Sequence, residues 1–454
     1  MASIATGSDS FIATLDQGPD SWDTPIPESS PTWTFHEHHA GGFEEANEPQ
    51  FSSEARNAGV RFGRVNEVGV SGSFPFDWKH KGFETMIQNV LELTSFEEVA
   101  SFVVAANQTK IDFREDTLDP ERHATVAAGT YTSTTLAAAI KAAMELVGDE
   151  TYTVTYDPAT MRWTIASAGA YLKLLWLTGA NQATSIADVI GFDHIDVTDA
   201  SAPVTLTAEN DVIALFDNVF AVPEDLDLSG LQPDGMTWYA HKNQQTDLIE
   251  NVFCQALAWT MNGNFLTFTP TLSGKKITVA DASPVSPTFS SELPAVVKGA
   301  LAVTINDTAN GGTTYTSVNT KGLTINCPRP ITMMMNDASS YAVDAAAGDK
   351  IKPEVSFSWF RNDRTTMDAI MDTRWRAGAA ITATFTLTSA VPLRTGGTIY
   401  PSTTWSFIAL MRKGGSSKVA GPGPIEQPYA WVAEVGPSGE PPMTLTLRNS
   451  TYLG

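Results

Sequence analysis

The stretch from Val65 to Thr94 changes its hydrophobic period halfway, which predicts two elements. In its first half apolar and polar positions alternate, as in a strand with one buried face. The alternating positions are Val68, Val70, Gly72, Phe74 and Phe76. In its second half the apolar spacing is i, i+3, i+4, i+7 and i+8, which places these residues on one stripe of a helix. They are Phe83, Met86, Ile87, Val90 and Leu91. A long strand followed by one packing helix is therefore expected.

The same order of elements recurs near the C-terminus. Val355, Phe357 and Trp359 alternate with polar residues. A helical stripe follows, and the strand pattern then resumes at Ile381, Ala383, Phe385 and Leu387. The stripe consists of Met367, Ile370, Met371 and Trp375. The pattern favours a duplicated strand-helix unit, although such units are also common in α+β folds. The linker "ADASPVSPTFSSELP", residues 280–294, is a probable domain boundary between the two copies.

Residues 106–209 have a different pattern, which predicts a separate α+β module. A helical stripe with Thr and Ser candidates for its N-cap is followed by two alternating runs around a turn at Asp157 and Pro158, typical of a hairpin. A second short helix is expected to end at Gly191. The stripe contains Leu136, Ile140, Ala143, Met144 and Val147, and the hairpin contains Tyr152, Val154, Tyr156, Trp163 and Ile165. We expect this module to be inserted between strands of the surrounding domain.

Composition and charge restrict the function. The 454 residues suffice for about three domains, and the apolar fraction of 42% predicts a folded chain. Residues 1–50 are rich in Ser, Pro and acidic residues, and we expect an extended arm whose aromatics stay solvated or dock elsewhere. The 28 basic against 51 acidic residues give a net charge of −23, which argues against binding a nucleic-acid backbone. Plain solubility explains the charge equally well.

Cysteine usage and hydropathy indicate folding in a cytoplasm. Cys254 and Cys327 are too few for a disulfide framework, so free buried thiols are expected. The N-terminus lacks the pattern of a secretion signal, and no apolar run approaches the ~20 residues of a spanning helix. We therefore expect no membrane insertion.

The sequence contains no strong motif for a catalytic, metal-binding or phosphate-binding site. The "FHEHHA" run contains His36, Glu37, His38 and His39, but Ala40 stands where a helical zinc-protease site needs its second histidine. A metal held by two of these histidines on a strand remains a minor alternative. No phosphate-binding loop or nucleophile elbow is found. The acidic residues Glu224, Asp225 and Asp227 could serve a glycosidase, but acidic loops are usually solvated. We assign no catalytic residue, cofactor or metal and expect no enzyme.

Two stretches resemble the major tail tube proteins of long, non-contractile-tailed bacteriophages. The stretch "VNEVGVSGSFPFDWKHKGFETMIQNVL" is similar to that family's strand and packing helix, and "DLIENVFCQALAWTMNGNFLTFTPTLSGKKI" is similar to its pair of long strands. The module, with "GTYTSTTLAAAIKAA", "YTVTYDPATMRWTI" and "IADVIGFD", is similar to a small domain that recurs in phage tail proteins.

The resemblance implies a mainly β (α+β) fold with tandem tube-type β-sandwiches, each carrying a packing helix. The domains would be an arm at 1–50, a first tube domain at 51–105 and 210–280, the module at 106–209, and a second tube domain at 295–454. The implied function is a virion structural protein, assembled in the bacterial host cytoplasm, whose rings stack into a channel for DNA. With two tube domains per chain, trimeric, pseudo-hexameric rings are expected, alongside other tail proteins as partners and DNA passing without specific binding.

Two alternatives stay open. The chain could be another tail component, such as a tip, baseplate or terminator subunit that forms a single ring. It could also bind carbohydrate, with Trp163, Trp176 and Tyr171 of the module as a sugar platform. The preferred interpretation of these aromatics is the module's own core.

Overall fold

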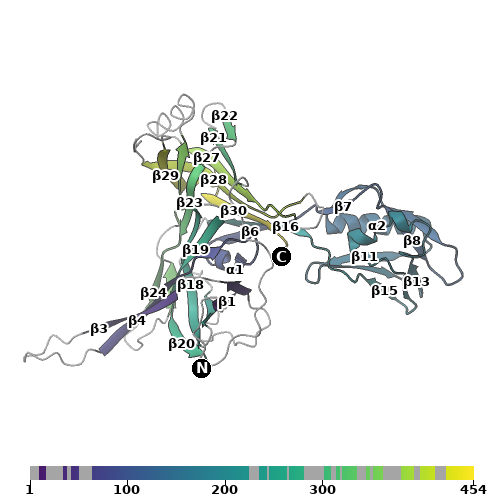
Figure 1. The fold of residues 1–454 in the computed structure, drawn as a ribbon, viewed down its shortest axis with the longest axis horizontal. Coiled ribbons are helices and arrows are strands. Elements are labelled where there is room, and N and C mark those ends of the chain that lie inside the picture. Colours follow the sequence, from purple (N-terminus) through teal and green to yellow (C-terminus); the bar gives the residue numbers. More distant parts are fainter. Residues whose placement is uncertain are drawn as a thin grey trace, which may run out of the picture. The chain divides into compact units, whose positions relative to one another are not determined.

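The fold is described by a computed structural model (Figure 1). The described residues are 10–16, 34–37, 42–50, 64–223, 235–242, 245–262, 265–280, 301–307, 313–316, 320–334, 344–347, 351–360, 380–392, 399–414 and 426–453. Antiparallel strands dominate, which confirms the mainly β class. The described residues form three α-helices, namely α1 (Glu84–Gln88), α2 (Ser133–Val147) and α3 (Ala187–Ile190).

The chain divides into two compact units. The first comprises Met1–Thr94, Val219–Ala390 and Ser402–Leu447. The second comprises Ser95–Asn218, Val391–Pro401 and Arg448–Gly454. Strands β6 (Glu92–Val99) and β16 (Leu215–Ala221) carry the chain from one unit into the other and back.

The longest strand of the first unit, β18 (Gln245–Asn262), belongs to two sheets. Its first part pairs with β17 (Met236–Lys242) and β20 (Lys276–Ala280). Its second part pairs with β19 (Phe265–Gly274) and β23 (Thr320–Pro328). The change coincides with Asn251, whose φ of 48° is left-handed, and with an irregularity in register between Cys254 and Ala256. A bulge of this kind bends a strand, so one strand can serve both sheets.

The smaller sheet includes strands from the predicted N-terminal arm. Strand β1 (Ser10–Asp16) pairs with β17 on one side and with β2 (Thr34–Glu37) on the other. Strand β3 (Gly42–Gln50) pairs with β4 (Arg64–Ser73) in the larger sheet. These backbone pairings join parts of the arm to the first unit, whereas Trp22, Trp33 and the side chain of Phe35 lie outside the described residues.

The larger sheet runs through both halves of the sequence. From β3 and β4 it continues through β19, β18 and β23, and every pairing along it is antiparallel. Beyond β23 the order is β26 (Glu354–Phe360), β29 (Glu426–Glu434), β28 (Ser402–Gly414), β27 (Ile381–Thr388), β21 (Leu301–Asp307) and β22 (Thr313–Thr316). Strand β5 (Phe76–Asp77) pairs with β19, and β30 (Met443–Asn449) pairs with β28. A separate hairpin joins β24 (Ile331–Met334) and β25 (Asp344–Ala347).

The predicted strand and helix of the opening stretch are present, but the helix is short. The five residues on its predicted stripe are all buried, as are the strand residues Val70, Phe74 and Phe76. Helix α1 has only five residues, because the chain turns after it into β6. The side chain of Asn89, at the helix C-cap, accepts a hydrogen bond from the Cys254 amide of β18 at 2.7 Å. This buried bond fixes the end of α1 to the sheet.

The second predicted strand-helix unit is described only in part. Val355 and Phe357 are buried in β26, and Ile381, Ala383, Phe385 and Leu387 are buried in β27, as the alternation predicts. Trp359 lies in β26. The helical stripe Met367, Ile370, Met371 and Trp375, the linker residues 281–294 and the turn residues 263–264 lie outside the described residues.

The second unit contains the predicted α+β module. Its helix α2 begins at Thr132, whose side chain forms a reciprocal capping box with Thr135. Helix α3 ends at Gly191, which adopts the left-handed φ of 77° that favours glycine. Its strands are β7 (Phe102–Val104), β8 (Lys110–Arg114), β9 (Arg122–Thr125), β10 (Gly129–Tyr131), β11 (Tyr152–Asp157), β12 (Arg162–Ser167), β13 (Leu172–Leu174), β14 (Val197–Asp199) and β15 (Val204–Thr207). They form sheets in the orders β11-β12-β15, β14-β13-β8-β9 and β10-β7.

The core of the module extends beyond residues 106–209. Phe102 and Val104 precede the predicted boundary and Val212 and Phe216 follow it, yet all four belong to the same buried cluster. Their rings and methyl groups pack with the helix stripe and the hairpin residues predicted from sequence. The compact unit therefore begins at Ser95 and continues to Asn218.

Candidate functional site

The feature of the first unit most relevant to function is the direct pairing of its two sequence halves. Strand β18 comes from the predicted first tube domain and β23 from the second, and they pair over Ala256–Thr260 and Thr324–Pro328. On the buried face Leu257 lies opposite Cys327, and Trp259 lies opposite Ile325. Cross-strand apolar pairs of this kind stabilise a sheet beyond its backbone ladder. The halves thus share one sheet.

A buried polar network also joins the two halves. The Trp78 indole donates to the Thr403 hydroxyl at 3.0 Å, and that hydroxyl lies 2.8 Å from His80 Nδ1. The hydroxyl has one proton and two lone pairs, so it can accept from Trp78 and, depending on the His80 tautomer, either donate to or accept from His80 Nδ1. Burial lowers the pKa of His80 to about 4, which keeps the ring neutral near pH 7. Strand β28 is therefore held to the strand-helix segment by neutral hydrogen bonds.

Several strands of the larger sheet have one partner in the described part of the chain, and β3 and β22 are two of them. Strand β3 pairs with β4, and β22 pairs with β21. Strand β4 pairs with β19 only through Val70–Ser73, so most of the β3–β4 ladder continues past β19. A two-stranded ribbon is marginally stable by itself, and a terminal strand offers backbone donors and acceptors to another chain.

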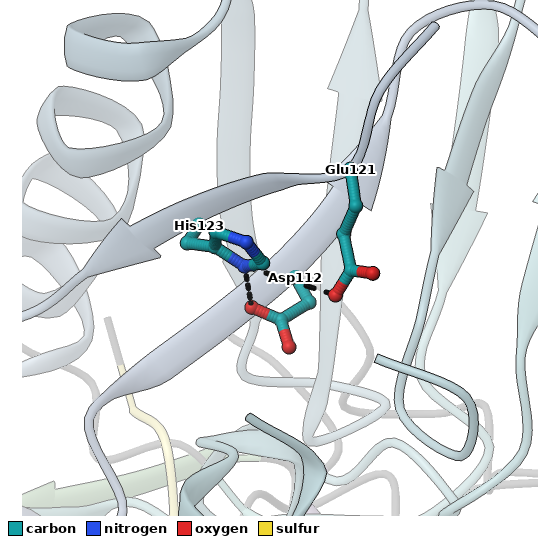
Figure 2. A group of neighbouring side chains, drawn as sticks. All are labelled: Asp112, Glu121 and His123. Carbon is teal, nitrogen blue, oxygen red and sulfur yellow. Dashed lines mark hydrogen bonds and ion pairs between the residues drawn. The ribbon is translucent and has the colours of Figure 1, made fainter. Parts of the chain in front are cut away.

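A group of ligating side chains that the sequence analysis did not single out lies in the module. Asp112 of β8 and His123 of β9 face each other across this strand pair, with Glu121 just before β9 (Figure 2). His123 Nδ1 lies 2.7 Å from Asp112 Oδ1 and 3.7 Å from Glu121 Oε1. The ligand atoms of the three residues lie within 4.8 Å of one another, a spacing that a metal ion could bridge.

Hydrogen bonds account for these carboxylates without a metal. Asp112, which is 3% exposed, accepts from the Asn181 amide at 2.6 Å, from Asn181 Nδ2 at 2.9 Å and from His123. Glu121 accepts from the Ala180 amide at 2.6 Å. The cluster therefore clamps the loop at residues 179–181 to β8 and β9. In the sequence, this cluster is indicated only by one acidic residue, Asp112, which stands between the apolar residues Ile111 and Phe113; both of these are buried.

A second buried carboxylate of the module has an equivalent structural role. Glu115 accepts from the Tyr152 hydroxyl at 2.5 Å and from the amides of Asp149 and Glu150 at 3.0 Å, and it forms an ion pair with Arg122, whose Nε lies 3.0 Å from Oε2. Burial, followed by this contact with Glu115, raises the pKa of the Tyr152 hydroxyl above its ordinary range. The phenol stays protonated and donates, so the group fixes the turn between α2 and β11.

The remaining candidates do not form a reactive site in the described residues. Trp163 and Trp176 are 0% and 1% exposed, so they cannot form an open sugar platform with the half-buried Tyr171. Cys254 and Cys327 are free and buried, as predicted, and burial raises the pKa of Cys327 to about 12. His36 and Glu37 end β2.

Two candidate groups are not described. His38 and His39 of the histidine run, and the acidic residues Glu224, Asp225 and Asp227, lie outside the described residues.

Among the described helices, the longest is the 15-residue α2, and none has the length and apolar character needed to span a bilayer. No family model matches the sequence, and no curated protein is significantly similar to it.

Proposed function

We propose that this chain is a structural subunit of a bacteriophage tail tube, which assembles into stacked rings around a channel for DNA. The observation that carries the proposal is the shared sheet, in which β18 and β23 pair the two sequence halves, while β3 and β22 each have a single partner among the described strands. In a ring whose subunits join their sheets, adjacent repeats must be connected by strand pairing. Each chain must also have unpaired strand edges to which the neighbouring chain can bind. The same backbone pairing between strands would then join the two repeats within a chain and the ends of neighbouring chains.

The composition agrees with a passive channel. A chain with a net charge of −23 has few cations to hold phosphates, so DNA would pass without sticking. The protein would act without a catalytic residue, cofactor or metal, through self-assembly and contacts with other tail proteins.

Electron microscopy of the purified protein, with quantitative mass spectrometry of virions, tests the proposal. We expect stacked rings and a copy number of many rings per particle. One ring per virion would favour a tip, baseplate or terminator subunit instead, and a monomer at all concentrations would contradict assembly.

A pair of edge variants sharpens this test. Replacing Thr314 and Tyr315 of β22 by proline removes one outward-facing amide and one amide that faces β21, because adjacent strand residues present their backbone groups to opposite edges. We expect this variant to remain folded but to lose assembly. The matched control places prolines at Ala345 and Ala346 of β25, which lies in a separate hairpin, and it should still assemble.

A further inference from the structure

Strand β11 forms one edge of a sheet in the module. In the order β11-β12-β15, β11 pairs only with β12 among the described strands. The Ala168 amide donates to the Thr151 carbonyl, which therefore faces β12, whereas the Tyr152 amide points away and donates to Glu145 Oε1 at 3.2 Å. Because these directions alternate along a strand, the amide and carbonyl of Val154 also face the open edge.

Apart from the Glu145 bond to the Tyr152 amide, this edge lacks the usual features that block strand addition. The run Tyr152–Tyr156 contains no lysine, proline or glycine, and its pairing with β12 has no bulge. Thr153 and Thr155 are exposed, while the Val154 side chain is 9% exposed and belongs to the core. An added strand would therefore meet a rigid backbone template that is already fixed by its own side chains.

A groove lies between β11 and α2. The two elements that line it are labelled in Figure 1. It has a volume of about 420 Å³ and is lined from β11 by Thr153–Tyr156. From α2 it is lined by Ser133, Thr134, Ala137, Ala138 and Lys141. The small alanines and hydroxyl groups leave space for an incoming main chain and can hydrogen-bond to it.

The negative charge of the module favours a positively charged peptide segment at the edge of β11. Residues 95–218 contain 18 acidic and 6 basic residues, a net charge of −12. Both ends of β11 carry acids, with Asp149 and Glu150 before it and Asp157 at its last position. Arg122 pairs with Asp149, and Lys141, the cation that lines the groove, lies 3.8 Å from Glu145. An incoming strand with lysines at its ends would meet opposite charge at both ends, and its uncharged centre would lie along Val154.

We infer that the open edge of β11 and its groove bind an extended, lysine-flanked peptide segment of another protein by strand addition. The bond pattern is an antiparallel or parallel ladder to Val154, with the segment's side chains directed alternately toward α2 and toward the face of Thr153 and Thr155. This makes the module a docking element for a partner, a role beyond tube assembly.

The test measures binding of a fluorescein-labelled probe, Lys-Lys-Thr-Val-Thr-Val-Thr-Lys-Lys, to the full-length protein by fluorescence anisotropy. We expect saturable binding and slower hydrogen exchange at the Val154 amide. Val154→Pro removes that amide without touching the β12 ladder and should weaken binding by about tenfold or more, whereas Val154→Thr, which keeps the amide, should not. Unchanged affinity in Val154→Pro would overturn the proposal, as would equal binding of a probe with glutamates in place of lysines.

A second pair of variants keeps the test decisive if the proline variant does not fold. Ala138→Arg places a long side chain in the groove, whereas Ala142→Arg makes the same change one turn along α2, at an exposed alanine outside the groove. Both add one positive charge. We expect only Ala138→Arg to abolish binding of the lysine-flanked probe, and equal affinities in the two variants would exclude the groove as the site.

Discussion

At the residue scale, the burial of Ile87 in the first unit leads to a stability prediction. Ile87 is 0% exposed on α1, and its neighbour Gln88 is exposed on the same short helix. Ile87→Asn leaves a cavity and buries an amide without a designed partner, so it should lower the free energy of unfolding by about 4 kcal/mol. Chemical denaturation of the unassembled chain measures this. Gln88→Asn is the control, and an equally large loss there would contradict the packing argument.

Ile370 was predicted to have the same role in the second strand-helix unit, and it lies outside the described residues. Its polar replacement should destabilise that half of the chain to a similar degree. This stays a prediction from the repeated pattern.

Residue His80 predicts how stability depends on pH. Its folded pKa of about 4 lies below the ordinary value of 6.5, so the unfolded chain binds the proton more readily. The contribution of neutral His80 is complete above about pH 6.5 and is lost as the pH falls toward 4, by about 3 kcal/mol in all. Denaturation curves at several pH values measure it.

Other carboxylates also titrate in the lower part of that window, so the comparison must be with a variant. In His80→Gln the loss of stability between pH 6.5 and 4 should be smaller than in the parent chain. Identical pH profiles for the two proteins would show that His80 is not the titrating group.

At the element scale, we expect that the module can be removed without unfolding the first unit, provided that the deletion includes all residues of the module's core. The Thr94 hydroxyl donates to the Val219 carbonyl at 3.1 Å, so the two ends left by a deletion of Ser95–Asn218 lie side by side. A short Gly-Ser bridge should close the gap, and the first unit should still fold and assemble. Circular dichroism and electron microscopy check both results, and loss of folding would show that the module belongs to the tube core.

A deletion of Ala106–Glu209 provides the contrast. It leaves behind Phe102, Val104, Val212 and Phe216, which all belong to the module's buried core. We expect this shorter deletion to aggregate, because it exposes an apolar remnant. Equal behaviour of the two deletions would contradict the boundary set by the core.

At the scale of the whole molecule, the two strand-helix units predict the symmetry of the ring. If each chain supplies two tube domains to a closed ring, three chains supply six, which gives true threefold and approximate sixfold symmetry. A reconstruction of the tail that resolves helices decides this. Six complete chains per ring, or a C-terminal half without a tube fold, would contradict the presence of two tube domains in each chain.

The sequence by itself determined the local elements, because hydrophobic period and capping act over a few residues. The strand at Val70–Phe76, the helix capped by Thr132, the hairpin of β11 and β12 and the helix end at Gly191 all follow from such short-range signals. The burial of Trp163 and of both cysteines followed from their apolar surroundings.

Only the tertiary structure decided how distant segments meet. The pairing of β18 with β23, the contact of Trp78 and His80 with Thr403, and the cluster of Asp112 with His123 and Asn181 join residues far apart in the chain. No periodicity encodes such pairings, since a strand pattern fixes which face is buried and leaves the neighbouring strand open. For the same reason α1 proved shorter than its apolar stripe: Asn89 ends it through a bond to β18.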